Sequence, residues 1–236
     1  PSASVSYTDG GGTSEAVTSA ATQAVNNVND APTGSVTVTG TATQAQTLTA
    51  ANTLADADGL GTLSYQWKAG GANINGATSS TYTLTQAEVG KTVTVTVSYT
   101  DGGGTSESVL SLASAVVSNV NDAPTGSVTV TGTATQAQTL TAANTLADAD
   151  GLGTLSYQWK AGGANINGAT SSTYTLTQAE VGKTVTVTVS YTDGGGASES
   201  VLSLASAVVS NFNDAPTGSV TVTGTATQGQ TLTAAN

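Results

Sequence analysis

Residues 92–99 read Thr-Val-Thr-Val-Thr-Val-Ser-Tyr, and this stretch decides the fold class. Apolar and polar side chains alternate strictly, so Val93, Val95, Val97 and Tyr99 share one face of an extended strand. Threonine suits the opposite, solvent-facing side because its branched side chain fits the pleat of a sheet. The pattern therefore predicts a half-buried β-strand.

Shorter stretches on either side of this strand alternate in the same way. We expect strands over 35–39, 46–50, 63–68, 72–75, 81–85, 92–99 and 107–117. Gly, Asn and Asp turns separate them, and only residues 85–89 have the composition of a helical turn. About seven short strands with one buried face each predict two packed antiparallel sheets, an all-β sandwich.

The chain is internally repeated with a period of 92 residues. Asn-Asp-Ala-Pro occurs at 29–32 and returns at 121–124 and 213–216. Segments 29–120 and 121–212 differ only where Thr105 is replaced by Ala197 and Val120 by Phe212. We predict two complete modules over these segments, the C-terminal part of a module over 1–28, and the N-terminal part of another over 213–236. We expect the chain to be a piece of a longer tandem array.

Composition excludes several classes of function. The chain has 4 Lys and Arg together against 15 Asp and Glu, no His and no Cys, and a net charge of −11. Disulfides, thiol chemistry and histidine-based catalysis or metal binding are therefore impossible. So few cations argue against nucleic-acid binding, and no apolar run is long enough to predict a membrane span.

Several motifs in each module carry a family resemblance. Residues 63–67 (LSYQW), 80–85 (STYTLT) and 88–91 (EVGK), followed by the alternating strand, resemble the immunoglobulin-like and cadherin-like tandem repeats of giant bacterial surface adhesins, including RTX-type adhesins exported by type I secretion. The Asn-Asp-Ala-Pro motif is similar to the calcium-binding linkers of cadherins. The resemblance implies extracellular or cell-surface spacer modules in an extended array, often stiffened by calcium. Unlike antibody domains, the chain has no cysteine pair, so Trp67 is expected to pack against aliphatic side chains.

Acidic residues in the predicted loops are the candidate metal ligands. In an immunoglobulin-like strand order, the relevant loops meet at the end where the chain enters each module. The predicted calcium ligands are Asp30, Asp56, Asp58 and Asp101 at one module and Asp122, Asp148, Asp150 and Asp193 at the next. Carboxylates brought together repel one another unless a cation neutralises them, and calcium accepts six to eight oxygen ligands in irregular geometry. The alternative is that these acids only keep the loops solvated and neighbouring modules apart.

Near-identical copies add length, whereas a catalytic site needs a single pocket. We therefore expect a non-catalytic spacer or stalk repeat whose partners are neighbouring modules of the same chain and, in a fibre, other copies. Two alternatives remain: a subunit of a self-assembling extracellular filament or sheath, and a carbohydrate-binding module with exposed aromatic side chains. An enzyme is not expected. The Asp-Gly-Gly-Gly stretch at 101–104 precedes a strand and lacks a following Lys, so it does not predict a phosphate loop.

Overall fold

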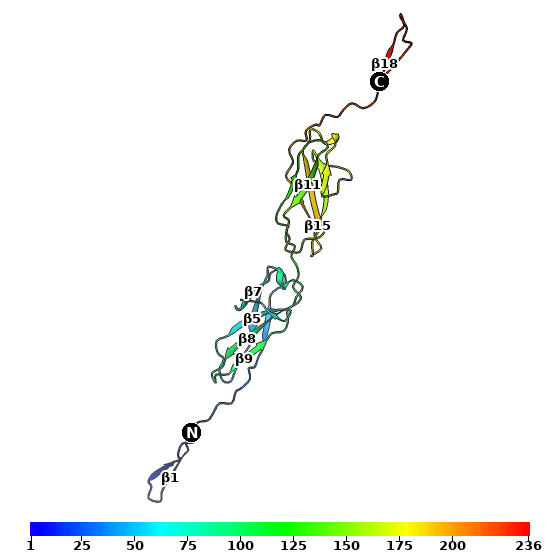
Figure 1. Ribbon diagram of the computed structural model, residues 1–236. Helices are drawn as coiled ribbons and strands as arrows, with labels where there is room; N and C mark the ends of the chain where they lie inside the picture. The colour runs from blue at the N-terminus through cyan, green and yellow to red at the C-terminus, as the bar shows by residue number, and fades with distance from the viewer. The chain divides into compact units, whose positions relative to one another are not determined.

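The computed structural model describes residues 1–236, and its regular structure consists of β-strands and two short 3-10 helices (Figure 1). The chain divides into two compact units, residues 1–120 and 121–236. Every pairing between strands is antiparallel. The all-β class predicted from the alternation is confirmed.

Unit 1 contains two small sheets between residues 36 and 110, besides a hairpin near the start of the chain. The first has the order β3-β4-β7 and is formed by β3 (Val36–Thr39), β4 (Thr47–Asn52) and β7 (Thr81–Thr83). The second has the order β6-β5-β8-β9 and is formed by β6 (Ala72–Asn73), β5 (Ser64–Ala69), β8 (Val93–Thr100) and β9 (Ser106–Leu110). Most expected strands are therefore found, with ends that differ by one or two residues.

Unit 2 repeats both sheets. Its three-stranded sheet is formed by β10 (Val128–Thr131), β11 (Thr139–Asn144) and β14 (Thr173–Thr175). Its four-stranded sheet is formed by β13 (Ala164–Asn165), β12 (Ser156–Ala161), β15 (Val185–Thr192) and β16 (Ser198–Leu202). The register between β12 and β15 matches that between β5 and β8, residue for residue.

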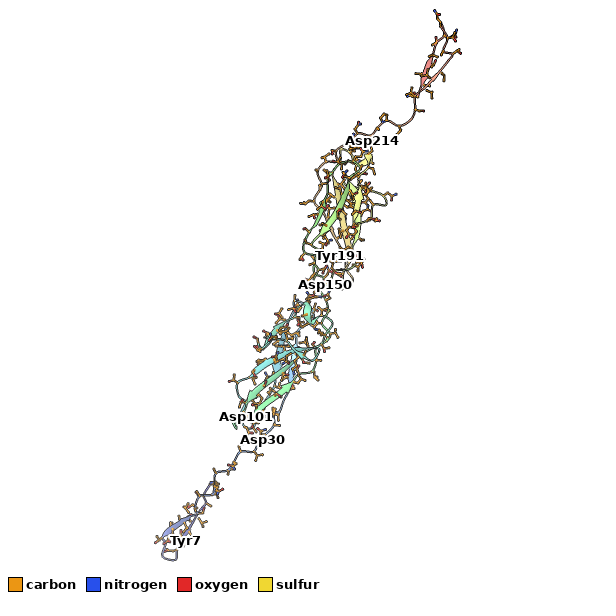
Figure 2. All side chains as sticks on the ribbon, in the orientation of Figure 1. Tyr7, Asp30, Asp101, Asp150, Tyr191 and Asp214 are labelled. Atoms are coloured by element: carbon orange, nitrogen blue, oxygen red, sulfur yellow. The ribbon has the colours of Figure 1, made fainter.

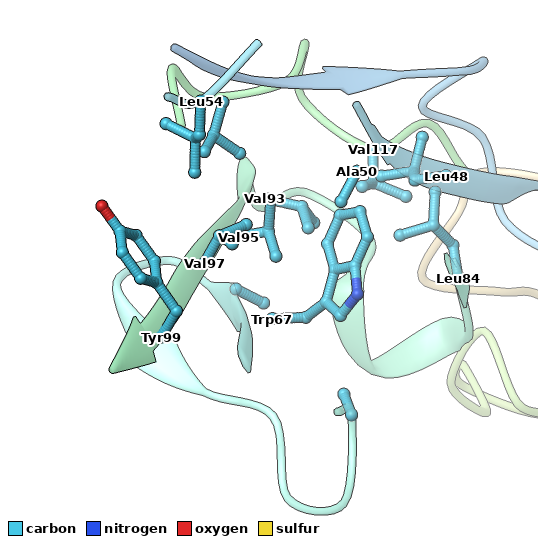
Figure 3. Packing of buried hydrophobic residues seen from close by; sticks show 13 residues of the cluster. Leu48, Ala50, Leu54, Trp67, Leu84, Val93, Val95, Val97, Tyr99 and Val117 are labelled. Carbon is cyan, nitrogen blue, oxygen red and sulfur yellow. The ribbon is translucent and has the colours of Figure 1, made fainter. Parts of the chain in front are cut away.

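The two sheets of unit 1 share one hydrophobic core (Figure 3). Val95 on β8 and Trp67 on β5 are completely buried, and Leu48 on β4 faces them from the other sheet at 1% exposure. The Trp67 indole N–H donates to the Ser79 carbonyl oxygen at 2.9 Å, so burial leaves no unpaired polar atom on this ring. Each fully buried aliphatic side chain stabilises the fold by about 1.5–3 kcal/mol. Two sheets over a common core are consistent with a β-sandwich, and unit 2 has the corresponding cluster around Trp159.

The helical turn expected over 85–89 is present as the 3-10 helix η1 (Gln86–Glu88). Thr85 caps it: the Glu88 carboxylate accepts hydrogen bonds from the Thr85 backbone N–H and hydroxyl at 2.9 and 2.7 Å. Glu88 is thus buried in a local cap, and η2 (Gln178–Glu180) repeats the arrangement. No helix of this chain has the length and apolar character that crossing a bilayer requires.

The prediction of a closing strand over 107–117 is wrong beyond Leu110, where β9 ends. The Ser111 and Ser114 hydroxyls accept the Val95 and Val93 backbone N–H groups, both at 2.9 Å, in place of backbone carbonyls. The serine N–H groups still donate to those same two valines, so three residues of this segment span two residues of β8. This bulge-like offset ends the regular ladder and leaves Leu112 84% exposed rather than in the core.

Each end of the chain adds an isolated hairpin. The first is formed by β1 (Ser4–Thr8) and β2 (Ser14–Thr18), and the last by β17 (Thr221–Thr223) and β18 (Thr233–Ala235). The β1–β2 register equals that of β8 and β9, which occupy the same positions of the repeat. Val5 is 68% exposed, whereas its counterpart Val97 is fully buried.

Candidate metal centre

Two groups of three aspartates each bring their carboxylates together. Asp56, Asp58 and Asp101, called triad 1, each offer one oxygen, and these oxygens all lie within 4.8 Å of one another. Asp148, Asp150 and Asp193, called triad 2, do the same in unit 2. In each unit, two of the aspartates come from the loop between the second and third strands of the module, and one comes from the loop between the last two.

Glycines allow the two loops of triad 1 to approach this closely. The Gly102 backbone N–H donates to the Asp58 carbonyl oxygen at 3.1 Å. A Cβ at Gly102 would collide with that same carbonyl, and a Cβ at Gly61 would collide with the Thr100 carbonyl. Any larger residue at either position would push the loops apart. Gly194 and Gly153 meet the corresponding carbonyls in unit 2.

Hydrogen bonds hold both oxygens of Asp56 and one oxygen of Asp101 in triad 1. The Asp58 backbone N–H donates to Asp56 Oδ1 at 2.9 Å, and the Thr105 backbone N–H donates to Asp101 Oδ1 at 2.7 Å. The Tyr99 hydroxyl donates to Asp56 Oδ2 at 2.6 Å. These bonds fix the side chains in place, and Asp101 Oδ2 receives none of them.

Some carboxylate oxygens of the triads are buried without any hydrogen-bond partner. They are Asp101 Oδ2 in triad 1, and Asp150 Oδ1 and Asp193 Oδ2 in triad 2. These three residues are only 5%, 8% and 6% exposed. A buried carboxylate oxygen with no donor is strongly unfavourable, and here other carboxylates lie nearby. A bound cation relieves both problems, so each triad can hold a metal ion.

Burial and the triad also act on the neighbouring tyrosines. Burial, the hydrogen bond to Asp56 and the charge of that carboxylate together raise the pKa of Tyr99 to about 12, with burial the largest cause. The same causes raise the pKa of Tyr191, whose hydroxyl donates to Asp148 Oδ2 at 2.6 Å. Both phenols therefore stay protonated at neutral pH and act as hydrogen-bond donors. Figure 3 shows the Tyr99 hydroxyl at the outer edge of the core.

Asp30 and Asp122 are not members of the two triads, and their role as calcium ligands stays a prediction. Their backbone N–H groups donate to Asp58 Oδ2 and Asp150 Oδ2, both at 2.7 Å. In unit 1 the preceding residue, Asn29, donates from its side chain to Glu107 Oε1 at 2.8 Å. In these contacts the Asn-Asp-Ala-Pro motif donates hydrogen bonds to carboxylates at the acidic end of the unit.

Figure 2 shows Asp30 and Asp101 at one end of unit 1, and Asp214 at the end of unit 2 away from Asp150. At that end, the Gln136 side-chain amide donates to Asp214 Oδ2 at 2.7 Å and accepts from the Phe212 backbone N–H at 3.2 Å. The equivalent Gln44 accepts from the Val120 backbone N–H at 3.1 Å. Each unit therefore fixes the chain segment that leaves its last strand.

The sequence does not predict that two kinds of residue, a core tyrosine and two turn glycines, belong to this centre. Tyr99 continues the apolar alternation of β8, so the pattern marks it as a core residue and hides its contact with Asp56. Gly61 and Gly102 look like ordinary turn glycines. The only available signal is position, since Tyr99 and Gly102 lie within two residues of Asp101.

A scan against protein-family models and a search of curated proteins return no match for this chain.

Proposed function

We propose that the chain is a non-catalytic structural segment of a bacterial extracellular adhesin or surface fibre. Immunoglobulin-like modules of 92 residues would repeat along it to span distance, and each would be stabilised by calcium at its triad. The family resemblance of the sequence supports this proposal, as do the two units with the same sheets and registers.

The observation that carries the proposal is the pair of triads with buried, unpartnered carboxylate oxygens. Calcium suits them because it binds hard oxygen ligands, takes six to eight of them, and tolerates irregular geometry. Magnesium needs a near-ideal octahedron and usually keeps several waters, which favours more open sites. The loop carbonyls beside the aspartates can supply further oxygen ligands.

The sugar-binding alternative loses its main support. Trp67 and Trp159 are both completely buried, so neither indole offers an exposed platform for a sugar ring. Tyr82, the half-buried aromatic side chain beside Trp67, packs against it with ring centroids 6.1 Å apart. A glycan array with the intact chain tests this alternative directly.

Calcium titration of the chelator-treated chain by isothermal calorimetry tests the proposal. Two sites per chain are expected, one for each triad. Scattering curves in calcium and in chelator then report whether the ion extends or stiffens the particle. An absence of binding heat together with identical scattering curves removes calcium from the proposal. Concentration-dependent growth in sedimentation velocity would favour the self-assembling filament instead.

A further inference from the structure

We propose that Tyr99 and Tyr191 are positioning residues for the cation. Each tyrosine holds one carboxylate of its triad in the orientation needed for binding and ties that carboxylate to a core strand. This inference rests on the proposed calcium binding at the triads. It assigns to a residue of the hydrophobic core a role in affinity for the ion.

A hydrogen bond from a core tyrosine holds the Asp56 carboxylate. Asp56 lies half-buried in a loop, yet its Oδ2 accepts a hydrogen bond of 2.6 Å from the Tyr99 hydroxyl. A donor to an ionised carboxylate makes a short and strong hydrogen bond. Tyr99 itself is only 4% exposed and belongs to the core cluster, so the donor is held rigidly.

Repulsion within triad 1 is the reason why the Asp56 carboxylate needs this restraint. The Asp56 carboxylate lies within 4.8 Å of those of Asp58 and Asp101, so without a tether it would turn toward solvent. The backbone N–H of Asp58 restrains one oxygen, and the Tyr99 hydroxyl restrains the other. Together they keep the side chain facing the triad before the ion arrives, which is the usual task of groups that contact metal ligands.

The same contact recurs in unit 2, between Tyr191 and Asp148 at 2.6 Å. The chain also contains a natural comparison. Tyr7 occupies the equivalent repeat position in the N-terminal hairpin and is 54% exposed. Its hydroxyl donates to a Glu15 carboxylate oxygen at 3.2 Å. That hairpin has no partner loop with aspartates, so Tyr7 has no triad to position.

The test is a double variant, Tyr99→Phe with Tyr191→Phe, in the full chain. Phenylalanine keeps the buried ring and removes only the hydroxyl. Calorimetric titration with calcium is expected to show affinity weakened about 10–100-fold at both sites, as for other residues that support metal ligands. Tyr7→Phe is the control without a triad. Tyr82→Phe is the control for losing a phenol beside a carboxylate, because Tyr82 interacts with Glu88 at a different place in the core.

Melting in chelator separates positioning from a purely structural role. If the hydroxyl only stabilises the fold, the double variant melts lower in chelator and binds calcium as tightly as wild type, and the inference is overturned. Tyr191→Phe alone keeps unit 1 as an internal reference, and a two-phase isotherm with one weakened site supports the inference even if the double variant folds poorly. Wild type that binds no calcium overturns the proposed function instead.

Discussion

Replacing Asp101 and Asp193 by asparagine should raise stability without calcium and remove the response to calcium. The asparagine Oδ1 can still accept the backbone N–H that holds the Asp101 side chain. Its amide nitrogen then takes the place of the buried oxygen that lacks a partner, and it turns a donor toward two carboxylates. One change thus removes a charge and the unpaired atom together.

The magnitude follows from the separation of the oxygens. Two ionised carboxylates at the 4.8 Å limit repel by about 3.5 kcal/mol at an effective dielectric constant of 20, and by about 1 kcal/mol in bulk water. Asp101 takes part in two of the three pairs of triad 1. Its replacement therefore relieves about 2 kcal/mol in unit 1 if the pairs are screened as in bulk water, and about 7 kcal/mol at an effective dielectric constant of 20. The chelator-treated double variant should melt roughly 8 °C or more above wild type.

Calcium should stabilise wild type and leave the double variant unchanged. At about 5 mM calcium, and with the dissociation constants of roughly 0.1–1 mM found in extracellular modules, wild type gains about 1–2 kcal/mol per unit. That gain corresponds to a rise of about 5–15 °C in melting temperature, and the double variant should show none of it. Differential scanning calorimetry in chelator and in calcium measures all four values.

Asp9→Asn is the matched control. Asp9 occupies the same repeat position in the N-terminal hairpin, and its Oδ1 accepts the Thr13 backbone N–H at 2.8 Å, but no aspartate loop faces it. This variant should leave both melting temperatures unchanged. If the double variant instead melts below wild type in chelator and still gains stability from calcium, repulsion among the three carboxylates does not govern this end of the unit.

Three further outcomes are expected. Gly102→Ala should separate the two loops, because its Cβ would collide with the facing carbonyl, and calorimetry should then show that unit 1 no longer binds calcium. Gly10→Ala, at the equivalent position of the N-terminal hairpin, adds a Cβ that meets nothing and should leave calcium binding intact. Leu48→Ala should lower the unfolding free energy by about 2–5 kcal/mol in denaturant titrations, whereas Leu112→Ala, at 84% exposure, should change it by less than about 0.5 kcal/mol. The folded-state pKa of Tyr99 is raised from 10.0 to about 12, so its contribution to stability is complete below pH 10 and is lost as pH rises through about 12. Alkaline unfolding of the calcium-free chain, followed by tyrosinate absorbance, should show this loss, and a phenol that titrates at its ordinary value would contradict it.

Strand positions followed from residue types because one face of each strand must be buried. The alternation at 92–99 predicted the buried valines of β8, and the composition of 85–89 predicted η1. The same pattern failed after Leu110, because serine hydroxyls there take the place of backbone carbonyls as acceptors. Local alternation carries no information about that exchange.

The centre was less accessible from the sequence than the strands. Sandwich topology indicated that the loops bearing Asp56, Asp58 and Asp101 would share one end, and the structure places them within reach of one another. The topology alone did not indicate that Asp30 contacts that end through its backbone N–H. The contact of Tyr99 with Asp56 joins residues 43 positions apart, and alternation assigns each of them separately.

The two positions at which the copies diverge both act through the main chain. Thr105 and Ala197 each pair with an aspartate through their backbone N–H and backbone carbonyl. Val120 and Phe212 each donate a backbone N–H to a glutamine while their side chains remain exposed. Substitution there leaves these bonds intact, so genetic drift at these sites is nearly neutral for the fold. In an array of such repeats, these two sites would be places where one copy can differ from the next without a change in its fold.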